Sequence, residues 1–170
     1  FRVDATIDFL VEDGATLAAQ TRSAGRAVTM TGEAFARLRP DVALVIADRY
    51  EAVSIALAAA CMNVPIAHLE GGEVSGSIDE RFRHAITKLA HLHLPANEES
   101  AERIARMGEA RDRIVVVGTP SLDLLTGMDL ADKATLARTP GGTGDPIDWS
   151  GDYVVVSQHP VPTESGSAEA

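Results

Sequence analysis

The chain has 170 residues, of which 45% are hydrophobic and 24% are charged. These values are typical of a globular protein of about one domain and exclude wholesale disorder. The 15 basic and 25 acidic residues give a net charge of −10, which disfavours binding to nucleic acid or to an anionic membrane surface. The single cysteine, Cys61, excludes an internal disulfide and suits a reducing compartment, so we expect a cytoplasmic protein. No apolar run reaches the roughly 18 residues of a membrane span.

The N-terminal part of the sequence predicts a short strand at residues 6–11 and a long Ala-rich helix at residues 14–38. Gly25 could kink this helix, and Pro40 should end it. The expected buried positions of the helix are its larger apolar residues, Leu17, Val28, Met30, Phe35 and Leu38.

Strands and helices then alternate. We predict strands at residues 42–47, 64–69, 92–95 and 114–117, and helices at residues 50–62, 79–90 and 97–107. Asn97 and Gly108 are expected to cap the last of these helices. Short connections between buried apolar strands indicate an α/β fold, with a parallel Rossmann-like sheet and helices on both faces.

The chain is predicted to contain three segments. Residues 1–125 would form an incomplete N-terminal Rossmann-like domain. Residues 126–151, rich in Gly and Pro, would form a linker with a short helix at 130–137. Residues 152–170 would open a truncated second domain with a strand at 153–157. Because the sequence begins with Phe1 rather than Met, we also expect it to be a fragment.

Two of the predicted strands end in acidic residues. Asp48 follows the strand at 42–47, and Glu70 follows the strand at 64–69. Ligands of parallel α/β sheets bind at the carboxyl ends of the strands, where two carboxylates could act as base and acid. The alternatives are that Asp48 caps the next helix and that Glu70 is a solvated loop residue. Gly71 and Gly72 fit either the close approach of a ligand or a tight turn.

The stretch before the helix at 79–90 combines capping and charged residues. Ser77 and Glu80 have capping-box spacing, and Asp79 could pair with Arg83 one turn later. A capped amphipathic helix is the simpler interpretation, although its N-terminus beside a basic residue would also suit a phosphate. Other candidate features are treated as structural: His91 and His93 lack further ligands for a metal, and the pairs Glu99–Arg103 and Glu102–Arg106 suit a solvated helix face.

Several motifs occur together and in order. They are DRYE at 48–51, HLEGGEVSGSIDE at 68–80, RHAITKLAH at 83–91, GTPSLD at 118–123 and QHPV at 158–161. This set resembles the hydrolysing UDP-N-acetylglucosamine 2-epimerases, the bacterial enzymes of sialic-acid synthesis and the epimerase half of the animal bifunctional enzyme. The resemblance covers roughly residues 38–164, far more than a lone motif.

The resemblance implies a two-domain, glycosyltransferase-B-like fold that binds a UDP-sugar between its domains. By position, it implies that the essential carboxylates are Asp48, Glu70 and Asp79, and that the substrate-binding residues are Arg49, His159, Glu73, Arg83 and His84. It further implies a homo-oligomer that needs neither a metal nor a nicotinamide cofactor. Three positions depart from the family pattern, namely Ala47, Arg81 and Phe82.

The implied reaction removes the C2 proton, eliminates UDP and adds water, giving N-acetylmannosamine. The isolated fragment would be inactive. The alternatives are a non-hydrolysing UDP-N-acetylglucosamine 2-epimerase, a hydrolysing epimerase for a UDP-diacetamido-trideoxy sugar, a glycosyltransferase of the same fold, and a non-catalytic fragment. The Gly-Gly-Glu-Val-Ser-Gly stretch after Glu70 argues against the non-hydrolysing type.

Overall fold

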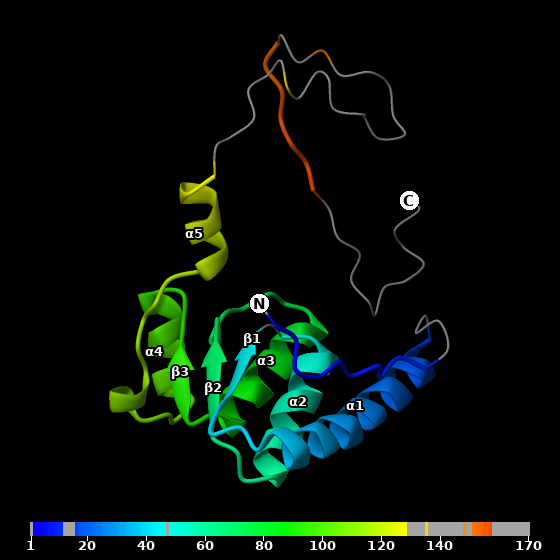
Figure 1. Ribbon diagram of the computed structural model, residues 1–170. Helices are drawn as coiled ribbons and strands as arrows, with labels where there is room; N and C mark the ends of the chain where they lie inside the picture. Colours follow the sequence, from blue (N-terminus) through cyan, green and yellow to red (C-terminus); the bar gives the residue numbers. More distant parts are fainter. Residues whose placement is uncertain are drawn as a thin grey trace. The chain divides into compact units, whose positions relative to one another are not determined.

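The computed structural model describes residues 2–11, 16–46, 48–128, 135, 148 and 151–157. The chain divides into two compact units, Phe1–Thr119 and Pro120–Ala170. The first unit contains, in chain order, α1 (Leu17–Leu38), β1 (Ala43–Ile46), α2 (Tyr50–Cys61), β2 (Ile66–Leu69), α3 (Ile78–Leu89), β3 (Leu92–Leu94), α4 (Glu98–Arg106) and the 3-10 turn η1 (Arg111–Arg113) (Figure 1). The second unit contains α5 (Pro120–Thr126). In the described part of the chain, none of the helices combines the length and apolar character needed to cross a membrane.

The sheet is parallel, as predicted, with the order β1-β2-β3. Residues 114–117, expected as a fourth strand, run beside β3 but make only one isolated bridge, between His93 and Ile114. The N–H of Val115 donates to the His93 carbonyl at 2.9 Å, and that of Val117 to the Pro95 carbonyl at 3.1 Å. This segment therefore forms an irregular edge of the sheet.

One face of the sheet packs against helices made largely of small residues. The core contains Val45, Ile66 and Ile86 together with alanines of α2. Helix α2 is buried on several sides, because it lies between the sheet and α1. On the opposite face, Leu44 and Ile46 of β1 are 57% and 52% exposed. The α/β class is confirmed, and the helix cover is seen mainly on one face.

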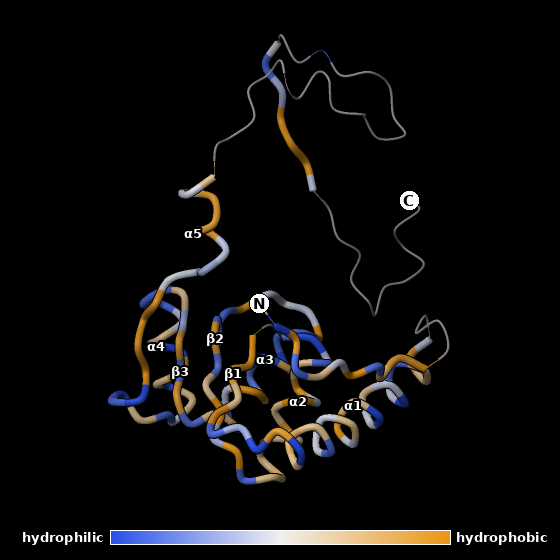
Figure 2. The backbone as a smooth tube through the Cα atoms, in the orientation of Figure 1, coloured by the Kyte–Doolittle hydropathy of each residue, from blue (hydrophilic) through white to orange (hydrophobic). Residues whose placement is uncertain are grey.

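Helix α1 buries a different face from the one expected. Its buried residues are Ala19, Ser23, Ala27, Thr31 and Ala34. Polar and apolar residues alternate along the helix (Figure 2). Small side chains at this spacing allow α1 to approach the Ala-rich α2 closely, so the prediction of large buried residues is wrong for Leu17 and Leu38, which are 64% and 45% exposed. The helix runs through Gly25 without a break and ends before Pro40.

Two predicted strands, both within the described residues, do not form. Residues 6–11 form no strand; this stretch is held by an edge-to-face contact of Phe9 with Tyr50 and by the Val11 N–H, which donates to Ser23 Oγ at 3.1 Å. Residues 153–157 also form no strand, and the exposed fractions of Val154 and Val156 are 87% and 85%. An apolar run becomes a strand only where another strand pairs with it. Except for Thr135, the helix predicted at 130–137 lies outside the described residues.

Candidate functional site

The candidate site lies at the carboxyl edge of the sheet. The last register pair between β1 and β2 joins Ile46 to Leu69, and the two strands end on the same side (Figure 1). Glu70 directly follows the end of β2, Asp48 comes two residues after the end of β1, and both are half-buried. The two carboxylates therefore leave adjacent strands at one edge, where ligands of parallel sheets bind.

Asp48 is held by an arginine from α3. The Nη2 of Arg83 forms an ion pair with Asp48 Oδ2, and its Nη1 donates to the Glu73 carbonyl at 2.8 Å. The side chain of Arg83 is only 8% exposed, against 26% for Asp48. Arg83 thereby fastens α3 to the end of β1 and to the loop after β2.

The structure does not contain two local interactions that the sequence suggested, the capping of α2 by Asp48 and the pairing of Asp79 with Arg83. Arg49, not Asp48, is the N-cap residue of α2, and it makes no side-chain capping bond. The suggested pairing of Asp79 with Arg83 is wrong, because the guanidinium of Arg83 is directed to Asp48 and Glu73. The charge of Arg83 is thus satisfied within the protein, which bears on its assignment to substrate binding.

The first turn of α3 is capped by its own loop. Ser77 Oγ accepts a hydrogen bond from the Asp79 N–H at 3.2 Å. Glu80 Oε2 accepts hydrogen bonds from the N–H groups of Ser75 and Gly76 at 2.9 and 2.8 Å. These donors lie two residues and one residue before Ser77, whose N–H would be the donor in a regular capping box. These two backbone donors, Gly76 first, lower the pKa of Glu80. The loop before α3 is therefore fastened to the helix that carries Asp79.

The remaining predicted site residues differ in their surroundings. Arg49 is exposed and pairs with Glu51 at 3.3 Å. His84 is half-buried, its Nε2 lies 3.9 Å from Glu80 Oε1, and its buried Nδ1 has no hydrogen-bond partner among the described residues. Glu73 borders a hollow of about 240 Å³ next to Arg103. His159 lies outside the described residues.

The glycines after Glu70 are required by the protein itself. Gly72 has φ +84°, and a Cβ there would lie 2.4 Å from the Ser100 carbonyl oxygen. A Cβ on Gly71 would lie 2.8 Å from His68 Nδ1. Arg103 of α4 donates to the Gly72 carbonyl and pairs with Glu99 at 2.9 Å. These contacts favour the tight-turn interpretation of both glycines, because neighbouring protein atoms occupy the space of a Cβ at each position.

Sequence reasoning missed several buried polar residues behind this edge. His68, Thr87 and His93 are at most 1% exposed. His93 Nε2 lies 3.2 Å from Glu109 Oε2, and Glu109 also pairs with Lys88. Burial lowers the pKa of His93. The signal for the two histidines was their position inside the apolar strands β2 and β3, where a buried imidazole requires a hydrogen-bond partner.

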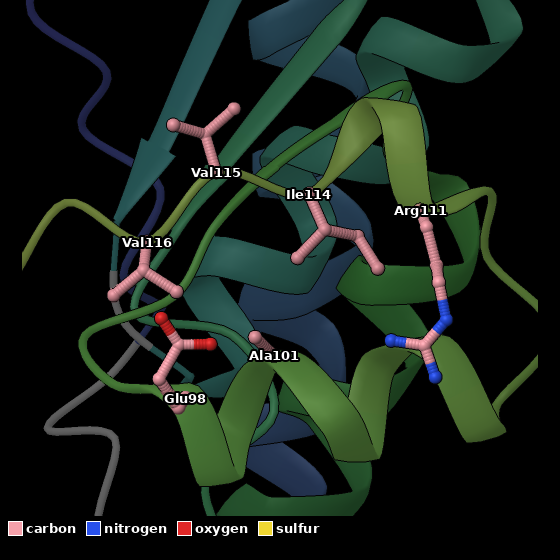
Figure 3. A pocket seen from close by; sticks show the side chains of 6 residues that line it. All are labelled: Glu98, Ala101, Arg111, Ile114, Val115 and Val116. Carbon is pink, nitrogen blue, oxygen red and sulfur yellow. The ribbon is translucent and has the colours of Figure 1, made fainter.

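A second, larger hollow lies between α4 and the segment at 111–116 (Figure 3). Its volume is about 400 Å³, and it is lined by Glu98, Ala101, Arg111, Ile114, Val115 and Val116. None of the predicted site residues borders it, and the Arg111 side chain is turned away from Glu98. Among the described residues, no group of three or more His, Cys, Asp or Glu side chains is arranged to hold a metal ion.

The fold is shared with solved epimerases. The crystal structure of the UDP-GlcNAc 2-epimerase from Neisseria meningitidis bound to UDP-GlcNAc matches 69% of this chain and 32% of that chain. The TM-score is 0.63 and the sequence identity 20%. At this identity the likeness establishes the fold alone.

Sequence comparison establishes the family. A family model of UDP-N-acetylglucosamine 2-epimerase matches residues 1–170, and the chain therefore belongs to this family. It is 50% identical over 91 residues to the UDP-N,N'-diacetylbacillosamine 2-epimerase (hydrolyzing) of Legionella pneumophila. The aligned region covers 54% of this chain and 24% of that relative. The chain is 35% identical over 141 residues to the UDP-N-acetylglucosamine 2-epimerase of Neisseria meningitidis, covering 83% of this chain and 36% of the relative. The chain thus spans about a quarter to a third of the length of these relatives.

Proposed function

We propose that the full-length protein containing these residues is a hydrolysing 2-epimerase that converts UDP-N-acetylglucosamine to N-acetylmannosamine and UDP. The observation that carries the proposal is the exit of Asp48 and Glu70 from adjacent parallel strands at one sheet edge. Helix α3, which carries Asp79 in its first turn, is fastened to that edge through Arg83. This supplies three carboxylates around one part of the fold, where proton removal and proton return can be divided between different groups.

The chemistry assigned to these groups is an elimination followed by an addition. A carboxylate removes the C2 proton while the bond between C1 and the UDP oxygen breaks, which leaves a C1–C2 double bond in the sugar. Water then adds its hydroxyl to C1, and a proton returns to C2 from the opposite face. The products are N-acetylmannosamine and UDP. We assign the proton transfers to Asp48, Glu70 and Asp79, without ranking them.

The leaving diphosphate needs positive charge and hydrogen-bond donors. We propose that Arg49 and His159 supply part of them. The guanidinium of Arg49 is free of the buried network and pairs only with the neighbouring Glu51 among the ion pairs of the described residues. Glu73 and His84 are proposed to contact the sugar nucleotide. For Arg83, the contacts with Asp48 and Glu73 favour a supporting role within the site rather than direct substrate binding. The complete site is proposed to need a second domain and a homo-oligomer.

A second substrate has its own support. The relative that is 50% identical over 91 residues is described as hydrolysing UDP-N,N'-diacetylbacillosamine, a UDP-diacetamido-trideoxy sugar. We therefore keep this sugar as the alternative substrate for the same reaction. Its additional acetamido group replaces a hydroxyl far from C2, so the carboxylate chemistry would be unchanged.

The experiment measures UDP release by the full-length protein from each of the two UDP-sugars, without an acceptor. We expect free UDP and a free 2-epimeric sugar from one of them, with kcat/KM at least about tenfold higher than for the other, since the loss of a hydrogen-bonded group commonly costs more than a factor of ten. A UDP-linked epimer would indicate the non-hydrolysing reaction. Release that depends on an acceptor would indicate a glycosyltransferase. Glu70→Gln, which keeps the shape but not the titratable proton, should abolish UDP release.

A further inference from the structure

The turn that carries Glu70 rests on a buried pair of side chains. His68, in the middle of β2, is 1% exposed, and Thr87 of α3 is fully buried. His68 Nδ1 lies 3.2 Å from Thr87 Oγ1. We propose that His68 and Thr87 are positioning residues that hold Glu70 in its working orientation. This inference rests on the proposed function, because it assumes that Glu70 takes part in the reaction.

The hydrogen bonds fix how the pair works. The hydroxyl of Thr87 donates its hydrogen to the Arg83 carbonyl, at 3.1 Å. A hydroxyl has one hydrogen, so toward His68 the Thr87 oxygen acts as the acceptor. His68 therefore carries its hydrogen on Nδ1. The pair joins the middle of β2 to the turn of α3 that also bears Arg83, the partner of Asp48.

Gly71 lies directly against this pair. A Cβ at Gly71 would come within 2.8 Å of His68 Nδ1 and 3.1 Å of Thr87 Oγ1. The residue before it, Glu70, has φ +60°, a left-handed conformation that a non-glycine residue adopts only when its surroundings impose it. The Glu70 N–H is held by the Leu94 carbonyl at 2.9 Å. The backbone of the turn is thus fixed by β3 on one side and by the His68–Thr87 pair on the other.

The consequence for the reaction is a loss of orientation when the pair is removed. His68 and Thr87 are buried behind the turn, so they do not touch a substrate at the sheet edge. Because a displacement of about 1 Å can cost about 100-fold in rate, we expect Thr87→Val to lower kcat by about 10- to 100-fold. KM should stay within about twofold of the wild-type value, since the orientation of Glu70 stabilises only the transition state.

The variants are made in the full-length protein and assayed by UDP release from whichever of the two UDP-sugars the wild type turns over. Thr87→Ser keeps the hydroxyl and should restore most of kcat. His68→Asn keeps an N–H near the position of Nδ1 and should retain more kcat than His68→Leu. The double variant His68→Leu/Thr87→Val should be no slower than the slower single variant, because the two substitutions remove the same hydrogen bond.

Thr31→Val is the matched control. Thr31 is also 1% exposed and helical, but it lies on α1, and its Oγ1 has no hydrogen-bond partner among the described residues. It should keep the wild-type kcat and melting temperature. The proposal is overturned if Thr87→Val keeps wild-type kcat, or if it loses no more kcat than Thr31→Val. If Thr87→Val does not fold, the histidine variants decide, and equal kcat for His68→Asn and His68→Leu overturns the proposal. Full activity of Glu70→Gln would instead remove Glu70 from the proposed site, and the absence of UDP release by the wild type would refute the proposed function.

Discussion

The substitution Gly72→Ala tests the close contact between the turn after β2 and helix α4. Gly72 combines a left-handed φ of +84° with a position where a Cβ would lie 2.4 Å from the Ser100 carbonyl and 2.8 Å from Ile104 Cγ1. The left-handed backbone costs a non-glycine residue about 1–2 kcal/mol. Overpacking of a well-filled site costs about 1–3 kcal/mol more. Gly72→Ala should therefore lower the free energy of unfolding by about 2–5 kcal/mol.

Two other glycines separate these contributions. Gly76 has φ +72°, but a Cβ there would meet no atom within 4 Å, so Gly76→Ala should cost only the backbone term of about 1–2 kcal/mol. Gly25, inside α1, also has nothing within 4 Å of a Cβ, and Gly25→Ala should stabilise the helix by about 0.5–1 kcal/mol.

The assay is urea unfolding followed by far-ultraviolet circular dichroism, with the free energy taken from the midpoint and slope. The expected order of stability is Gly25→Ala, wild type, Gly76→Ala and then Gly72→Ala. If Gly72→Ala unfolds at the same midpoint as Gly76→Ala, the contact with α4 is not what requires glycine there, and the reasoning is refuted.

Three further predictions concern the charged groups. Arg83→Leu should destabilise the protein by about 1–3 kcal/mol, because it leaves the half-buried Asp48 without its partner, whereas Arg49→Leu should cost about 0–1 kcal/mol, as for an exposed pair; equal urea midpoints would contradict this. The pKa of Glu80 is lowered by the N–H groups of Gly76 and Ser75, so its stabilising effect is present above the ordinary glutamate pKa and is lost as pH falls through the lowered one. Glu80→Gln should thus be less stable than wild type at neutral pH and equal to it in strong acid, and a gap that persists in acid would contradict this assignment. The pKa of His93 should lie below 6.5 in a nuclear magnetic resonance titration, because burial disfavours the imidazolium while Glu109 partly opposes the shift; Glu109→Gln should lower it further, and a rise would exclude that contact.

The sequence was sufficient to predict those features that follow from local residue patterns and from the parallel direction of the strands. Apolar runs followed by Asp48 and Glu70 predicted parallel strands that end at one edge, and the register of β1 and β2 confirms that placement. Asn97 caps α4 by accepting a hydrogen bond from the Ser100 N–H at 2.9 Å, as its position before a helix indicated. These features depend on neighbouring residues or on the direction of the strands.

The features that the sequence did not predict depend on distant partners. Arg83 has an acidic residue four positions earlier, yet its partner, Asp48, lies 35 residues away on another element. Likewise, Glu102 pairs with Arg111 at 2.9 Å instead of with Arg106. The larger side chains of α1 were expected inside, but an Ala-rich neighbour favours a small-residue contact face. Spacing along one helix cannot reveal such contacts.

The central claim is that carboxylates at the edge of the sheet remove and return the C2 proton during hydrolysis. The most direct test is to run the full-length wild-type protein in heavy water and to measure deuterium at C2 of the released sugar. We predict one deuterium at C2 for each UDP released. Glu70→Gln should lose both UDP release and deuterium incorporation. Turnover that leaves the original hydrogen at C2 would contradict it.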